Sequence, residues 1–129
     1  MPRPIRATFD AAAFARNLAV ARARAGGARV WAVVKANAYG HGLVRAARAL
    51  GAADGFALLD LDEAVRLREA GVRQTILLLE GFFAAADLEP IARHALTAVV
   101  HSSEQIALLE SIRPSRPFDV FLKLNTGMN

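Results

Sequence analysis

The 129 residues carry a formal charge of +4, with 54% hydrophobic residues, 22% charged residues and no cysteine. This composition indicates one folded domain with a buried core, and it excludes disulfides and thiolate metal sites. Acidic residues lie between the arginines, so the charge predicts a solvated surface rather than a nucleic-acid site. No apolar run approaches the roughly 18 residues of a membrane span, and we expect a cytoplasmic protein that does not bind membranes.

The amino-terminal part begins with a short extended segment at Ile5–Phe9. Asp10 can then cap a helix over residues 11–25, which Gly26 and Gly27 would end. From this point the sequence repeats an apolar run, a polar turn and an amphipathic helix. A repeat of this kind is typical of βα units.

The predicted strands follow this repeat along the chain. They cover Val30–Lys35, Gly55–Leu59, Thr75–Leu79, Leu96–Val100 and Asp119–Leu124. The helices between them are expected at Leu43–Leu50, Leu61–Ala70, Ala84–His94 and Glu104–Ile112. The pairs Asp60 with Glu63, and Ser102 with Gln105, have the spacing of capping boxes.

The apolar runs are nearly continuous, which favours a parallel sheet covered on both faces. Right-handed crossovers then allow a (β/α)8 barrel or an open doubly wound sheet. No Gly-x-Gly-x-x-Gly follows the first run, so the barrel is favoured. About five strands can be counted, whereas a barrel has eight strands and about 250 residues. We therefore expect an incomplete amino-terminal portion of an α/β barrel.

Lysine is scarce in this chain. Only Lys35 and Lys123 are lysines, and the other 14 basic residues are arginines. A guanidinium stays protonated, whereas a desolvated amine can attack a carbonyl. Because Lys35 ends the first predicted strand, its position predicts a Schiff base with an aldehyde cofactor such as pyridoxal phosphate. The structural alternative is a lysine that extends its charge into solvent.

The turn at 36–42 contains the chain's only tyrosine. The hydroxyl of Tyr39 can donate to a phosphate oxygen, or the ring can simply cover the rim of the barrel. Asn37 can hold the turn through its side-chain oxygen, and the two glycines of the turn can adopt positive φ.

The three histidines give little indication of chemistry. His41 lies beside glycines and is expected to be a structural hydrogen-bond donor rather than a general base. His94 falls late in a predicted helix and His101 just after a predicted strand. They show no metal-ligand spacing, so we expect no metal site.

Two motifs carry a family resemblance. Residues 33–42, which read VVKANAYGHG, resemble the pyridoxal-phosphate attachment motif of alanine racemases. Residues 121–129, FLKLNTGMN, resemble the fifth-strand segment of the same family. With both motifs in the family's order, the resemblance covers essentially residues 1–129, as the amino-terminal portion of the family's barrel domain. Other pyridoxal enzymes of this barrel type share the lysine, but their flanking residues differ from ANAYGHG.

The resemblance implies roles for three residues. Lys35 matches the lysine that binds pyridoxal phosphate and removes the α-proton of the D-enantiomer. Tyr39 matches a tyrosine that contacts the cofactor phosphate. Lys123 matches a lysine that many members carbamylate, and whose anion orients an arginine expected directly after Asn129. The family's second base is a tyrosine from the carboxyl-terminal β domain of the partner subunit.

The resemblance therefore implies a homodimeric full-length isomerase that interconverts L-alanine and D-alanine and supplies D-alanine for peptidoglycan. We expect the 129 residues alone to lack the rest of the barrel and the β domain and to be inactive. They would also be prone to aggregate through the apolar edges at 30–34 and 120–124. The alternative is a pyridoxal-phosphate homeostasis protein, which carries the cofactor without turnover.

Overall fold

The computed structural model describes residues 3–114 and 117–127. Strands and helices alternate along this part of the chain. The strands are β1 (Trp31–Val33), β2 (Gly55–Leu58), β3 (Thr75–Leu78), β4 (Thr97–Val100) and β5 (Val120–Leu122). The helices are α1 (Ala11–Arg24), α2 (Lys35–Tyr39), α3 (Leu43–Ala49), α4 (Leu61–Glu69), α5 (Ala85–Arg93) and α6 (Ser103–Glu110).

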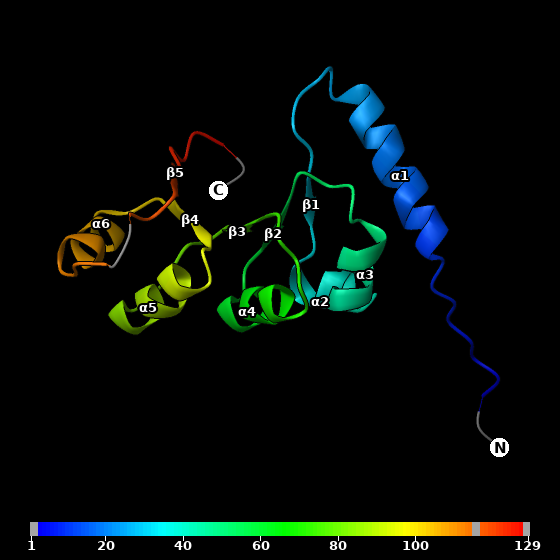
Figure 1. The fold of residues 1–129 in the computed structure, drawn as a ribbon, viewed down its shortest axis with the longest axis horizontal. Coiled ribbons are helices and arrows are strands. Elements are labelled where there is room, and N and C mark those ends of the chain that lie inside the picture. The colour runs from blue at the N-terminus through cyan, green and yellow to red at the C-terminus, as the bar shows by residue number, and fades with distance from the viewer. Residues whose placement is uncertain (1–2, 115–116, 128–129) are drawn as a thin grey trace.

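The strands form one parallel sheet in the order β1-β2-β3-β4-β5, which can be followed in Figure 1. The register runs evenly across the first strands, where Ala57 pairs with both Val33 and Leu77. A doubly wound sheet reverses its strand order at a switch point, and these described strands show no reversal. The prediction of an incomplete α/β barrel with five parallel strands is therefore confirmed.

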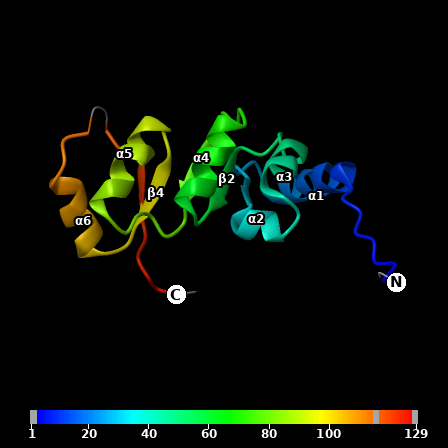
Figure 2. The ribbon, with the colours of Figure 1, turned by 90° about the horizontal axis from the view of Figure 1, so that it is seen from below.

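The helices form a layer beside the sheet. Figure 2 shows α6, α5, α4, α3 and α1 in a row, which is the order of a barrel wall with its outer helices. The core between the layers contains nearly inaccessible side chains from strands and helices, among them Phe56, Leu58, Leu67, Ile76, Leu78, Leu88 and Ile91. In the described part of the chain, none of the helices has the length and apolar character needed to cross a bilayer.

Polar side chains start several helices. Asp10 accepts a hydrogen bond from the Ala13 amide at 3.1 Å, and Asp60 accepts one from the Glu63 amide at 3.0 Å. Ser102 accepts one from the Gln105 amide at 3.3 Å. These bonds confirm the predicted caps, because the first amides of a helix have no partner within it.

The concave face of the sheet carries a smaller apolar cluster. Ala57, Leu77 and Val99 are buried there, and Trp31 packs against them. The ring of Trp31 on β1 lies 5.7 Å from the ring of Phe121 on β5, edge to face. Three strands separate β1 from β5, so this contact requires the sheet to curve until these two strands face each other. Such curvature is that of a barrel whose interior is filled by side chains.

The predicted strand ends differ from the observed ones at both lysines. β1 ends at Val33, because Val34 leaves the extended region with φ −127° and ψ 23°. Lys35 is thus the first residue of α2 and not the last residue of the strand. Lys123 directly follows β5, and its amide still donates to the carbonyl oxygen of Val100 at 2.9 Å. The last two residues of the FLKLNTGMN motif lie outside the described residues.

Arginines connect the loops at the amino ends of the strands. Arg68 donates to four carbonyl oxygens at 2.8 to 3.1 Å, those of Val72, Gln74, His94 and Ala95. Arg22 donates to the carbonyl oxygen of Ala52 and forms an ion pair with Asp54 at 3.3 Å. Both arginines lie where helix ends leave carbonyls without partners within the helix.

Candidate active site at the carboxyl ends of the strands

Lys35 lies half-buried at the carboxyl end of β1. The preceding residue, Val34, is 1% exposed, and its amide donates to the carbonyl oxygen of Ala57 at 2.8 Å. The chain therefore stays attached to β2 as far as the lysine. Lys35 is the second residue after the end of β1, so it lies at the carboxyl edge of the sheet. In parallel barrels this end of the strands carries the functional residues.

The turn that follows Lys35 has an unusual backbone. Ala36, Asn37, Ala38 and Tyr39 have φ values of 52°, 53°, 54° and 53°, which form one left-handed helical turn. Left-handed backbone costs about 1–2 kcal/mol per L-residue and is normally limited to single positions. Strain of this kind persists only where the surroundings fix the conformation, and it is concentrated at functional sites.

Asn37 stabilises the turn in the predicted way. Its side-chain oxygen accepts from the Leu43 amide at 2.9 Å, and its carbonyl oxygen accepts from the Gly42 amide at 2.9 Å. Gly40 and Gly42 adopt φ values of 83° and 92°, as predicted. The turn is thereby tied to the start of α3.

Tyr39 and Lys123, like Lys35, lie at the carboxyl ends of the strands. Tyr39 is 61% exposed and is separated from Lys35 by one turn of chain. Lys123 is exposed and lies two residues after Phe121, whose ring contacts Trp31 across the concave face. Lys35 and Tyr39 thus follow β1 and Lys123 follows β5, at the same end of the parallel sheet.

Acidic and amide side chains hold the loops at this end of the strands. The carboxylate of Glu63 accepts from the Asn37 amide at 2.9 Å, instead of completing the predicted capping box with Asp60. The buried side chain of Gln105 accepts from the His101 amide and donates to the carbonyl oxygens of Glu80 and Phe82. The spacing of these two residues in the sequence predicted only that they are capping partners. The i+3 spacing is the same in either role, so it could not distinguish them.

The histidines have structural contacts. The His41 ring packs edge-on against Phe14 with centroids 5.2 Å apart, so its main contact is aromatic and not the donated hydrogen bond that we expected. The Nε2 atom of His101 lies 3.2 Å from the carbonyl oxygen of Glu80. In the stretches 3–114 and 117–127, histidines and carboxylates do not gather into any group of three or more that could hold a metal ion.

In the first turn of α6, the backbone amide of Glu104 lowers the pKa of its own carboxyl group.

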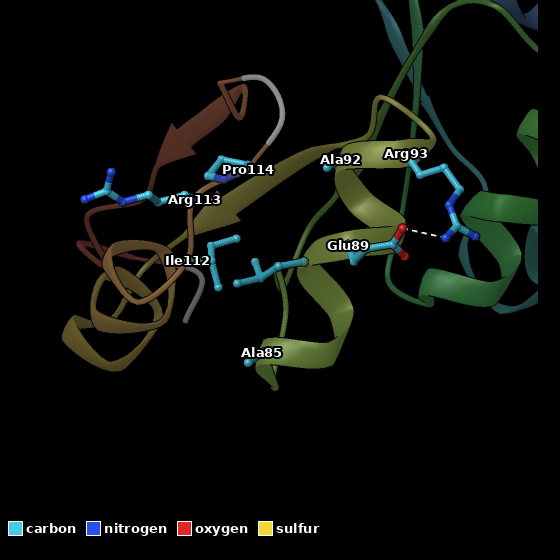
Figure 3. A pocket seen from close by; sticks show the side chains of 8 residues that line it. Ala85, Glu89, Ala92, Arg93, Ile112, Arg113 and Pro114 are labelled. Atoms are coloured by element: carbon cyan, nitrogen blue, oxygen red, sulfur yellow. Dashed lines mark hydrogen bonds and ion pairs between the residues drawn. The ribbon is translucent and has the colours of Figure 1, made fainter.

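A cavity of about 480 Å³ lies elsewhere, between α5 and the segment after α6 (Figure 3). Leu88, Ile112 and Pro114 line it, together with the Glu89–Arg93 ion pair. The cavity belongs to the outer helix layer, and neither lysine of the chain lines it. It is therefore not part of the site at the strand ends.

The fold and this site define a class: an α/β barrel portion with a lysine on a strained turn after its first strand. Residues 9–129 match the family described as alanine racemase, N-terminal domain. The chain belongs to this family.

Named relatives and solved structures agree with this family membership. The chain is 61% identical over 129 residues to an alanine racemase of Nitrosospira multiformis and 57% identical to one of Burkholderia mallei. The match covers 100% of this chain and 36% of each relative. Among solved structures, the biosynthetic alanine racemase of Pseudomonas aeruginosa superposes with a TM-score of 0.85 at 38% identity, over 91% of this chain and 33% of that one. An alanine racemase of E. faecalis superposes with a TM-score of 0.82 at 38% identity, over 92% of this chain and 33% of that one.

Proposed function

We propose that this chain is the amino-terminal portion of the barrel domain of an alanine racemase, with Lys35 as the residue that binds pyridoxal phosphate. The observation that carries the proposal is the half-buried Lys35 at the start of a strained turn at the carboxyl end of β1. The chain spans about a third of the length of its relatives, so the activity belongs to a protein that also contains the remaining two thirds.

The side chains at this turn fit the chemistry of the cofactor. An aldehyde requires a primary amine, and a phosphate requires hydrogen-bond donors. Lys35 supplies the amine, and the exposed hydroxyl of Tyr39, one turn further along the chain, supplies a donor. Bound pyridoxal phosphate supplies an electron sink that stabilises the negative charge left on the α-carbon of an amino acid.

Lys35 has two tasks in this proposal. Its amine would hold the cofactor and would also take the α-proton on one face of the amino acid. Racemisation needs a second base on the opposite face, which we assign to the part of the protein beyond these residues. Lys123 serves as the carbamylated lysine, which orients an arginine.

The substrate and the assembly follow from the relatives and from the resemblance. The relatives are named for alanine, so we propose L-alanine and D-alanine as substrate and product. We also propose a cytoplasmic homodimer that supplies D-alanine for peptidoglycan.

The test uses a chimera in which these 129 residues replace the matching 36% of the Nitrosospira multiformis enzyme. We expect the chimera to racemise alanine and to show the absorption band of lysine-bound cofactor. Borohydride reduction should attach the cofactor to Lys35. With only two lysines in the replaced part, peptide mapping distinguishes Lys35 from Lys123 directly.

Lys35→Ala and Lys35→Arg are the decisive variants. Both should lose the band and at least about 10³-fold in racemisation rate, because arginine keeps the charge but cannot condense with an aldehyde. Label on Lys123 alone, or full activity in either variant, would contradict the proposal. Labelling of Lys35 without racemisation would favour the cofactor-carrier alternative.

A further inference from the structure

The strained turn after Lys35 needs support from outside itself. Four consecutive L-residues with φ near +53° cannot be stabilised by their own sequence, since only Asn37 among them tolerates this region readily. Within the turn, the amides of Ala38 and Gly40 bond to the carbonyl oxygens of Val34 and Ala36 at 2.9 and 3.0 Å. These local bonds close the turn but do not fix its position relative to the sheet.

Glu63 joins the turn to the next βα unit. Its carboxylate oxygen accepts from the Asn37 amide at 2.9 Å, across 26 residues of sequence. A hydrogen bond to an ionised acceptor is roughly twice as strong as a neutral one. The bond is made at the second left-handed residue, so it acts where the backbone is strained.

The surroundings of Glu63 fix its position. Asp60 caps α4 through the Glu63 amide at 3.0 Å, which sets the first turn of the helix. β2, which α4 follows, pairs with β1 directly. Glu63 and Ala36 also line one cavity of about 440 Å³ beside the turn. Glu63 therefore begins the helix that follows β2, and β2 pairs with the strand that precedes Lys35.

We propose that Glu63 is a positioning residue for Lys35 and Tyr39. By holding the Asn37 amide, it keeps the left-handed turn in the geometry in which both side chains reach the cofactor. This inference rests on the proposed function, but the support of the turn can be measured without it. Glu63 need not touch substrate or cofactor to act in this way.

Three variants of Glu63 in the chimera separate geometry from charge. Glu63→Gln keeps an oxygen at the same distance but without the charge, so it should lose less cofactor affinity than the other two variants. Glu63→Asp keeps the charge but is shorter by one methylene, and Glu63→Ala removes the acceptor. Both should weaken cofactor binding and lower kcat/KM, by up to about 10²-fold, the loss typical of a displacement of about 1 Å. Asp62→Ala removes one charge from the same helical turn and should leave both quantities unchanged.

The readout that is independent of the cofactor is hydrogen exchange of the Asn37 amide in the cofactor-free chimera. Exchange should be faster in Glu63→Ala and Glu63→Asp than in Glu63→Gln or Asp62→Ala. Unchanged exchange and affinity in Glu63→Ala, or a Glu63→Asp variant better than Glu63→Gln, would overturn the inference. If the unmutated chimera failed to bind the cofactor at Lys35, the proposed function would fail, while the exchange measurement would still decide whether Glu63 holds the turn.

Discussion

The two ends of the parallel sheet differ in the side chains that most often bind the backbone there. At the amino ends, donors predominate: Arg68 binds four carbonyl oxygens, and the Gln74 amide group donates to the carbonyl oxygen of Gly51 at 2.9 Å. At the carboxyl ends, acceptors predominate: Asp60, Glu63 and Asp87 bind backbone amides.

The difference follows from the direction of the helices. Each helix ends near the amino end of the next strand, where its last carbonyls have no partner, and begins at the carboxyl end of the preceding strand, where its first amides have none. Arginine and glutamine satisfy the carbonyls, and carboxylates satisfy the amides. The carboxyl ends therefore carry the acidic residues, and among them a lysine amine is unusual. The amino ends therefore contribute to stability, whereas the carboxyl ends also hold a strained turn.

Arg68→Ala gives the largest expected effect and tests the amino end. Removing the guanidinium leaves several carbonyls without their charged donor, so the free energy of unfolding should fall by about 3 kcal/mol. Urea unfolding of the chimera, followed by circular dichroism, measures it. The control is Arg66→Ala, which removes an exposed arginine of the same helix and should change stability by less than about 0.5 kcal/mol. Equal losses in the two variants would remove the special role of Arg68.

A pair of glycine variants compares the two ends directly. Gly71 at the amino ends and Gly81 at the carboxyl ends have φ values of 91° and 76°, so alanine is strained at both, by about 1 kcal/mol. A Cβ at Gly71 meets open space, whereas one at Gly81 would collide with the carbonyl oxygen of Val99. Gly81→Ala should therefore cost about 1–3 kcal/mol more than Gly71→Ala in the same unfolding assay. A smaller loss at Gly81 would mean that this loop adjusts freely.

The smallest expected effect concerns pH. Backbone amides donate hydrogen bonds to the Asp10 carboxylate, and the amide of Ala13 contributes most. These bonds lower the pKa of Asp10 below its ordinary value of 3.8. The lowered pKa of Glu104 lies below 4.5. A carboxyl group with a lowered pKa stabilises the fold fully above its ordinary value and loses this contribution as the pH falls through the lowered value. The helix starts should therefore loosen in acid, while the arginines at the amino ends stay charged.

NMR titration of the Ala13 amide checks this expectation. Its chemical shift should follow Asp10 with a midpoint below 3.8, and Asp10→Asn should abolish the titration. A midpoint above 3.8 would contradict the lowered pKa.

The order of elements, the parallel sheet and the caps at Asp10, Asp60 and Ser102 were predictable, because each depends on local patterns. The bonds of Arg68 to His94 and Ala95, and the bond of Glu63 to Asn37, were not, because these partners lie 26 or 27 residues away in the sequence, in neighbouring units. The left-handed turn could not be predicted either, because Ala36 and Ala38 have no sequence preference for that region and the bonds of Asn37 to Glu63 and Leu43 join it to other segments.

By itself, the sequence determined the repeat of βα units and the position of a rare lysine after the first strand, since periodicity and residue type are local properties. Only the tertiary structure decided how that lysine is presented. The curvature that brings Trp31 onto Phe121, and the carboxylate of Glu63 on the Asn37 amide, arise from contacts between distant segments. The free energy of such contacts depends on how the strands and helices pack together, which no single stretch of the chain specifies.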